Sequence, residues 1–187
     1  MTRHAQGPER QRERDDEWLV HREVGIDIDA PPAVVFDLVS DVTRIGDWSP
    51  ECHGADWVGE RRGEGARFTG HNRWGRNRWS RVCEVVAYEP ERAFAYRTVP
   101  GFRFGPSADS SVWGFRIEPT ATGSHLVLSL RPVKAPQRWF RPFIRRFMGH
   151  HLDMRDQMHT TLGALKVAAE AHHVGAISGE PQGRAPS

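Results

Sequence analysis

Cysteine is scarce in this chain of 187 residues, and the two that are present, Cys52 and Cys83, lie far apart. No CxxC pair occurs, which excludes a cysteine-held metal cluster and a dense disulfide framework. The first residues contain no apolar signal-peptide core, and no apolar run reaches the roughly 18 residues of a membrane span. The sequence therefore predicts a cytoplasmic protein with reduced thiols.

The motifs of nucleophilic and phosphate chemistry are also missing. The chain contains no GxSxG, HExxH or GxxxxGK[ST] pattern. The glycines at 59, 63 and 65 lack the lysine and the following helix of a phosphate loop, so they indicate a relaxed turn. The pairs His150–His151 and His172–His173 are adjacent residues, which point in different directions on a helix. They do not predict a zinc site, and we expect no metal and no cofactor.

Net charge is small, at +2 from 26 basic and 24 acidic residues, and does not by itself imply nucleic acid. Residues 72–81 interleave arginine with tryptophan, as single-strand-binding sites do. A basic β-hairpin with a solvated outer face explains the same pattern. We prefer that interpretation and expect no nucleic-acid partner.

Aromatic residues are frequent, with seven Trp and nine Phe against two Tyr. Because a buried indole N–H needs a partner, several of these tryptophans are expected to line a cleft or an interface. Hydrophobic residues at 38% and charged residues at 27% are typical of a globular protein. The chain is long enough for one domain with a sizeable core.

Polar segments bound that domain. Residues 1–17 mix both charge signs without core-forming side chains, which predicts a disordered tail. Residues 173–187 are rich in Gly, Ser and Pro and predict a second tail. The domain is then 18–172, with no internal repeat and no second domain.

Periodicity predicts one strand, two short helices, six strands and a long helix. The first strand covers 18–29, and a helix follows from Pro32 to about Val39. Asp41 is the expected N-cap of the second short helix, which ends near Gly46. The six later strands are expected at 52–59, 66–74, 78–88, 93–99, 110–118 and 125–132. Short turns between them require antiparallel pairing.

The last element is expected to be a single amphipathic helix over 136–172. One stripe carries Phe147, His151, Met154, Met158 and Leu162, and such a helix needs a concave partner. A curled seven-stranded antiparallel sheet supplies it, which makes the fold class α+β. Methionine and histidine on that stripe have two explanations: an irregular core, or the wall of a cavity.

This order of elements resembles the SRPBCC superfamily, the START-like helix-grip group, and within it the polyketide cyclase/dehydrase branch. The segments 36–52 and 65–72, with Trp79, Pro90 and Trp113, carry the resemblance, which covers about 18–170. It implies a helix-grip fold with a deep apolar pocket between the sheet and the last helix. No catalytic motif of a characterised cyclase matches, so the resemblance assigns no catalytic residue.

Strand alternation and the helical stripe nominate the side chains of that pocket. The expected ligand-binding residues are Trp48, Trp57, Phe68, Asn72, Trp79, Tyr96, Trp113, His151, Met154 and Met158. Each of them has the alternative role of packing the core. A one-residue bulge would invert the faces of a strand, so the individual assignments depend on register.

Two functions fit such a pocket. The first is a carrier or sensor of a small hydrophobic ligand, aromatic, polyketide-like or lipid-like, including lipid transport. The second is a polyketide cyclase/dehydratase that moves protons by acid/base chemistry. Candidate groups for the second are His71, His151, Tyr96 and Arg81, with His71 expected to point away from Phe68. No histidine has a carboxylate partner at a recognisable spacing, which favours binding.

Residues 138–147 form a cationic amphipathic segment. Trp139, Phe143 and Phe147 recur at four-residue steps, four arginines accompany them, and no acidic residue is present. Pro142 is expected to kink the helix or to mark a break. The segment either closes the mouth of the barrel or makes weak contact with an anionic membrane surface.

Overall fold

The computed structural model describes residues 18–99, 111–133, 135, 138–139, 141–147 and 153–178. Seven strands account for most of them: β1 (Arg22–Ile28), β2 (Cys52–Val58), β3 (Arg67–Trp74), β4 (Asn77–Glu89), β5 (Ala93–Thr98), β6 (Ser111–Pro119) and β7 (Ser124–Pro132). The helices are α2 (Pro32–Ser40), the 3-10 helix η1 (Val42–Asp47), α3 (Arg141–Phe147) and α4 (Arg155–Ser178). The order and type of every predicted strand are confirmed.

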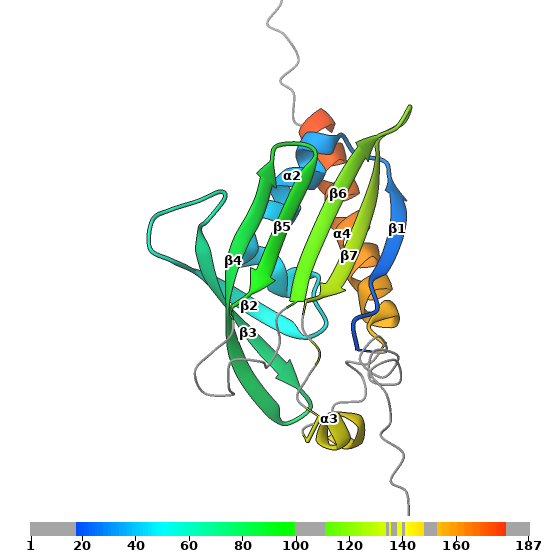
Figure 1. Cartoon of the computed structure of the whole chain (residues 1–187). Coiled ribbons are helices and arrows are strands. Elements are labelled where there is room, and N and C mark those ends of the chain that lie inside the picture. Colours follow the sequence, from blue (N-terminus) through cyan, green and yellow to red (C-terminus); the bar gives the residue numbers. More distant parts are fainter. Residues whose placement is uncertain are drawn as a thin grey trace, which may run out of the picture.

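All seven strands form one antiparallel sheet in the order β1-β7-β6-β5-β4-β3-β2. Among the described strands, only the β1–β7 pair joins strands that are distant in sequence, because β2 to β6 lie between them in the chain. The sheet curls, and α2 and α4 lie together against its concave face (Figure 1). The predicted α+β helix-grip architecture is therefore confirmed.

Local sequence explains the two short helices. Pro32 occupies the first turn of α2, where a missing N–H costs nothing, and the helix buries Val35 and Leu38. Asp41 caps η1 as predicted, since its carboxylate accepts hydrogen bonds from the Thr43 backbone N–H at 3.1 Å and hydroxyl at 2.6 Å. Trp48 follows as the C-cap of η1.

The prediction of one helix over 136–172 was wrong. The structure has two helices instead, α3 and α4. A break before the long helix, one of the two alternatives expected at Pro142, is present, but Pro142 itself lies in the first turn of α3. The side chain of Asp153 accepts a hydrogen bond from the backbone N–H of Arg155 at 3.2 Å, which starts α4. The sequence prediction missed this break because the apolar periodicity continues across it, and periodicity carries no information about helix caps. At the other end, α4 runs past His172 to Ser178.

The apolar stripe of α4 packs on the sheet as expected. Its buried side chains are Met154, Met158, Leu162, Leu165 and Ala169. At the edge of the stripe, Lys166 donates to the Asp27 carbonyl at 2.8 Å, and Glu170 accepts from the Asp29 N–H at 3.0 Å. These two contacts attach α4 to β1. Within the described residues, no helix has both the length and the apolar character needed to cross a bilayer.

A pair of glycine substitutions, one in η1 and one in α4 for comparison, tests how closely η1 packs against β2. A Cβ at Gly46 would lie 2.5 Å from the His53 carbonyl oxygen, whereas a Cβ at Gly163 of α4 meets nothing within 4 Å. Gly46→Ala is expected to destabilise by about 1–3 kcal/mol because η1 must move off β2. Gly163→Ala is expected to stabilise by roughly 0.5–1 kcal/mol through helix propensity. Urea unfolding of both variants measures this, and equal losses would contradict the packing described.

Candidate functional site

Strand register brings six of the predicted pocket residues onto one face of the sheet. Residues that pair across neighbouring antiparallel strands share a face. Trp57 pairs with Phe68, Asn72 pairs with Trp79, and Tyr96 pairs with Trp113. The faces assigned from alternation are thus confirmed for these strands. The face is the concave one, because Phe36 of α2 packs edge-on against Tyr88 of the same face at 5.1 Å.

Aromatic rings form a continuous row along this face. Successive ring centroids are 5.8 Å apart for Trp57–Phe68, 5.1 Å for Phe68–Tyr96, 6.0 Å for Tyr96–Phe94 and 6.5 Å for Phe94–Phe115. Three of these pairs are edge-to-face or tilted, which are arrangements that aromatic rings favour. The row therefore crosses the concave face from β2 to β6.

The two ends of the concave face differ in burial. Near α2 and the middle of α4 the face is closed: Phe94 and Leu126 are 0% exposed and Ile117 is 3% exposed. Towards the β3–β4 turn and the start of β6, the inward-facing side chains are only half-buried. We call this region the open end; its residues are Asn72, Trp79, Arg81, Thr98, Ser111 and Trp113. Apolar rings that remain partly exposed on a concave face are typical of ligand sites.

The other predicted pocket residues belong to the buried core or lie outside the described residues. Met154 and Met158, at the start of α4, are 6% and 1% exposed, and Trp48 is 4% exposed. Phe68 is also 1% exposed, so it packs the core as well as belonging to the aromatic row. His151 lies outside the described residues.

Two thiols and a phenol lie beside the open end. Burial raises the pKa of the Cys83 thiol to about 12; nearby Cys52 adds to the increase, while Arg81 opposes it. Burial also raises the pKa of Tyr96 well above its usual value, with smaller contributions from Cys83 and Cys52. All three groups are therefore protonated at neutral pH. They can donate hydrogen bonds but do not serve as proton acceptors there.

Gln157 is a candidate that the sequence analysis missed. Its side-chain oxygen Oε1 is buried and has no hydrogen-bond partner among the described residues. A buried acceptor without a donor costs about 1–3 kcal/mol, so such an atom calls for an explanation. Gln157 lies one turn after Met154, and that three-residue step was the signal that could have identified it.

His71 has the carboxylate partner that the sequence analysis did not find. Its Nε2 is hydrogen-bonded to Asp56 Oδ2 at 2.9 Å, and its Nδ1 to Ser80 Oγ at 3.0 Å. Sequence spacing could not reveal this carboxylate, because Asp56 comes from the neighbouring strand β2. Alternation does place His71 opposite Phe68, on the outer face. It therefore does not act on a ligand held by the concave face.

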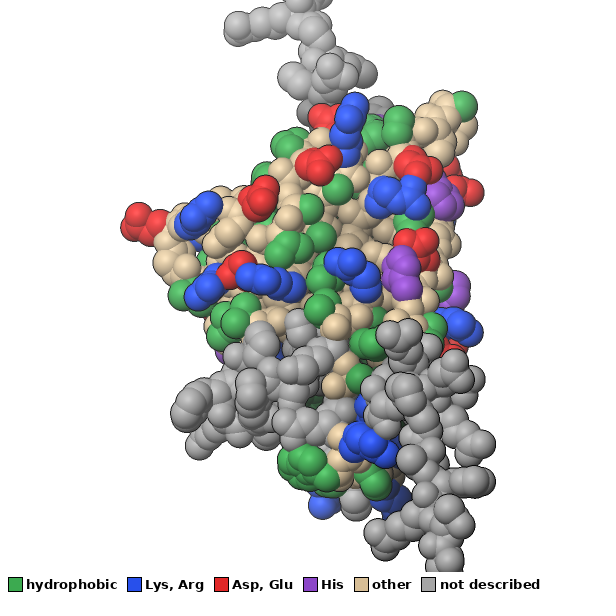
Figure 2. All heavy atoms as spheres, in the orientation of Figure 1, with side chains coloured by type: hydrophobic (Ala, Val, Ile, Leu, Met, Phe, Trp, Pro, Cys, Tyr) green, Lys and Arg blue, Asp and Glu red, His purple; other side chains and the backbone are tan. Residues whose placement is uncertain are grey.

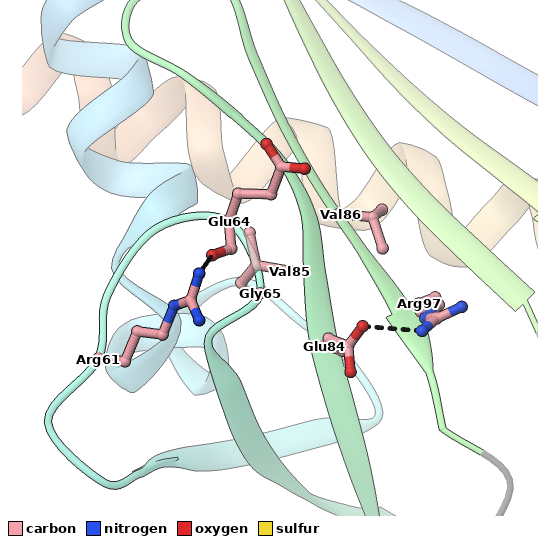
Figure 3. A pocket seen from close by; sticks show the side chains of 7 residues that line it. All are labelled: Arg61, Glu64, Gly65, Glu84, Val85, Val86 and Arg97. Carbon is pink, nitrogen blue, oxygen red and sulfur yellow. Dashed lines mark hydrogen bonds and ion pairs between the residues drawn. The ribbon is translucent and has the colours of Figure 1, made fainter.

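A charged hollow of about 520 Å³ lies on the outer face, where β4 bulges beside the loop after β2 (Figure 3). Its arginines and Glu84 already have hydrogen-bond partners within the protein. Arg67 and Arg97 both bind Glu84 at 2.8 Å and thereby lower its pKa, and Arg61 donates to the Glu64 carbonyl at 2.8 Å. This hollow is open to solvent and, unlike the concave face, holds no row of apolar rings.

A curled antiparallel sheet closed by a C-terminal helix defines the helix-grip class of proteins. Within that class, the family described as "Polyketide cyclase / dehydrase and lipid transport" matches residues 20–170. The chain belongs to this family, as the resemblance implied. No curated protein matches the chain.

Solved structures show the same fold. The aromatase/cyclase Zhui from a Streptomyces species superposes with a TM-score of 0.67 at 18% identity, covering 82% of this chain and 95% of that one. A major latex-like protein from Panax ginseng gives 0.59 at 16% identity, with 83% and 98% covered. A Mesorhizobium loti protein gives 0.58 at 23% identity, with 81% and 98% covered. At these identities the likeness concerns the fold alone.

The raised pKa values predict a loss of stability in alkali. Cys83 has an unfolded pKa near 9.0 and a folded pKa of about 12. A raised folded pKa contributes stability below pH 9, and that contribution falls as the pH rises towards 12. Tyr96 acts in the same direction above pH 10. The urea midpoint of the wild type is expected to decrease from pH 8 to pH 11. In the double variant Cys83→Ala, Tyr96→Phe, the midpoint should decrease less over the same pH range.

Val85→Ala is the matched control for that experiment. Val85 is 1% exposed and pairs with Tyr96, but its side chain does not ionise. The substitution should lower stability by a similar amount at every pH and leave the slope unchanged. If the Cys83→Ala, Tyr96→Phe variant keeps the wild-type slope, burial of these two groups is not the cause of the alkaline loss.

Proposed function

We propose that this protein binds a small, mainly hydrophobic molecule at the open end of the concave face and acts as its carrier or sensor. The observation that carries the proposal is the half-buried state of Trp79 and Trp113 on a face that is fully buried around Phe94 and Leu126. A ligand that covers part of both rings removes roughly 200 Å² of apolar surface from water, which contributes roughly 5 kcal/mol before association costs. Polar contacts must supply the remaining specificity.

Three polar groups are suited to orient the ligand. Asn72 and Arg81 face inward from β3 and β4 and can donate to a carbonyl or hydroxyl oxygen. The buried oxygen of Gln157 can accept from a ligand hydroxyl. A molecule with an apolar body, one hydroxyl donor and one oxygen acceptor satisfies all three. That description fits aromatic, polyketide-like and lipid-like compounds.

The second candidate function is a cyclase or dehydratase acting on a poly-carbonyl chain in the same place. The family description supports it, as does the presence of Arg81 and Tyr96, both ionisable, on the concave face. Such a reaction needs a group that takes a proton next to a carbonyl. Tyr96 and Cys83 are protonated at neutral pH and do not fill that role, which is why binding is the preferred function.

Ligand binding can be measured with an apolar fluorescent probe and by native mass spectrometry of the purified protein. The wild type is expected to retain an apolar compound or to bind the probe. Trp79→Ala with Trp113→Ala should weaken probe binding at least ten-fold, because both ring contacts are lost. Val82→Ala is the control: this exposed residue lies between Arg81 and Cys83 on the outer face and should change nothing. If Val82→Ala weakens probe binding as much as the double tryptophan variant does, the ligand does not bind on the concave face.

Turnover separates the two functions. The carrier is expected to leave a poly-carbonyl substrate unchanged over hours, as followed by liquid chromatography and mass spectrometry. If product forms, and if Arg81→Ala or His151→Ala abolishes it while the probe still binds, the enzyme function is correct and the carrier function is wrong. Probe binding in the same variants shows that each one still folds.

A further inference from the structure

Aromatic and basic side chains are exposed together around α3. Trp139, just before the helix, is 76% exposed, and Phe143 within it is 46% exposed. The arginines at 138, 145 and 146 are exposed as well. Apolar rings and charged guanidinium groups are thus exposed within one short segment, although apolar rings usually favour burial and guanidinium groups favour water.

α3 is held in place by Trp18, which precedes β1. The guanidinium groups of Arg141 and Arg145 each lie 5.7 Å from the centre of the Trp18 ring. Such cation–π contacts contribute about 0.5–1 kcal/mol each at exposed sites. They attach the helix to the start of the sheet while Trp139 and Phe143 remain exposed.

A second basic and aromatic element reaches the same end of the molecule. It is the tip of the β3–β4 hairpin, where Trp74 is 38% exposed and is flanked in the sequence by exposed arginines at 73, 76 and 78. Both this tip and α3 lie at the lower end of the view (Figure 1). Hydrophobic and basic side chains gather at this end of the surface (Figure 2). We call the two elements together the basic–aromatic end.

The two sequence stretches that form this end carry charge of one sign. The sequence has 24 acidic residues, yet none lies in 65–83 or in 119–152, the two stretches that contain the hairpin tip and α3. The near-zero net charge of the whole chain therefore conceals a segregation of charge. A surface of this kind attracts anionic partners.

We propose that the basic–aromatic end docks the protein on an anionic lipid bilayer. An arginine near an anionic surface contributes about 1 kcal/mol, and tryptophan favours the headgroup level, where its ring is apolar and its N–H is hydrated. A polyanion such as nucleic acid would use the arginines alike. Binding to nucleic acid would not require the exposed apolar residues Pro142 and Phe143. In a bilayer, both residues can enter the boundary between the headgroups and the acyl chains.

The position of the surface is related to the proposed ligand site. Asn72 and Trp79, residues of the open end, come directly before and after the hairpin tip in the sequence. A ligand leaving the open end would emerge beside the docked bilayer. This last step depends on the proposed function, whereas docking itself does not.

Co-sedimentation of the full chain with lipid vesicles tests docking. We expect binding to vesicles of phosphatidylcholine with one third phosphatidylglycerol at about 0.01 M salt, and release at about 1 M salt, where the Debye length falls to about 3 Å. Binding to phosphatidylcholine alone should be much weaker. Arg138→Gln with Arg146→Gln should lower the partition coefficient about 30-fold, at roughly five-fold per charge. Trp139→Ala with Phe143→Ala should lower it further in high salt.

The matched control is Arg92→Gln with Arg116→Gln, which removes the same charge from exposed positions on the turn before β5 and on β6. It should reduce binding no more than two-fold. Absence of binding to anionic vesicles in low salt overturns the proposal, and so does an equal loss in the control. Two other results also overturn it: a single-stranded oligonucleotide that binds and displaces the vesicles, or a dimer that Trp139→Ala with Phe143→Ala dissociates.

Probe binding in the same variants keeps the two proposals separate. Changes at Arg138, Arg146, Trp139 and Phe143 should leave the affinity for the apolar probe unchanged. If the wild type binds vesicles but no probe, docking stands and the ligand function fails. If it binds the probe but no vesicles, the reverse holds.

Discussion

Burial of one face of a curled antiparallel sheet is the constraint on which the rest of this structure depends. Each strand contributes alternate side chains to that face, and seven strands make more apolar surface than one helix can cover. α4 attaches along β1 through Lys166 and Glu170, and α2 covers the part of the face around Tyr88 and Phe94. The inward side chains of β3 and β4 beyond Phe68 are left half-buried. The open end thus follows from the geometry of the fold rather than from any local motif.

Much of this arrangement could be predicted because short turns force antiparallel pairing, and pairing fixes which side chains share a face. Bulges limited the prediction. The shift between Val85 and Ala87 inserts one residue in β4, so Tyr88, rather than Ala87, faces inward beside Phe94. Alternation alone would have reversed these two. Trp57 kept its expected face because the irregularity in β2 lies before it, between Cys52 and Gly54.

The other features that the sequence did not reveal depend on contacts between residues distant in the sequence or on the hydrogen bond of a single backbone group. Asp56 orients His71 from the neighbouring strand, at no spacing that a motif could specify. The break before α4 depends on one hydrogen bond from the Arg155 N–H to Asp153. Gln157 looks like a surface residue by type, and only its burial shows that its oxygen needs a donor.

The polar chemistry of the concave face favours recognition over proton transfer. Burial keeps Cys83 and Tyr96 neutral, so both groups can donate hydrogen bonds but neither takes a proton at neutral pH. Arg81, on the same face, adds a positive group beside the apolar rings. The same charge sign dominates the outside of this end, on the hairpin tip and on α3. Under the two proposals, the surface and the concave face would therefore both attract an amphiphile whose polar group is electron-rich, first at the bilayer and then within the sheet.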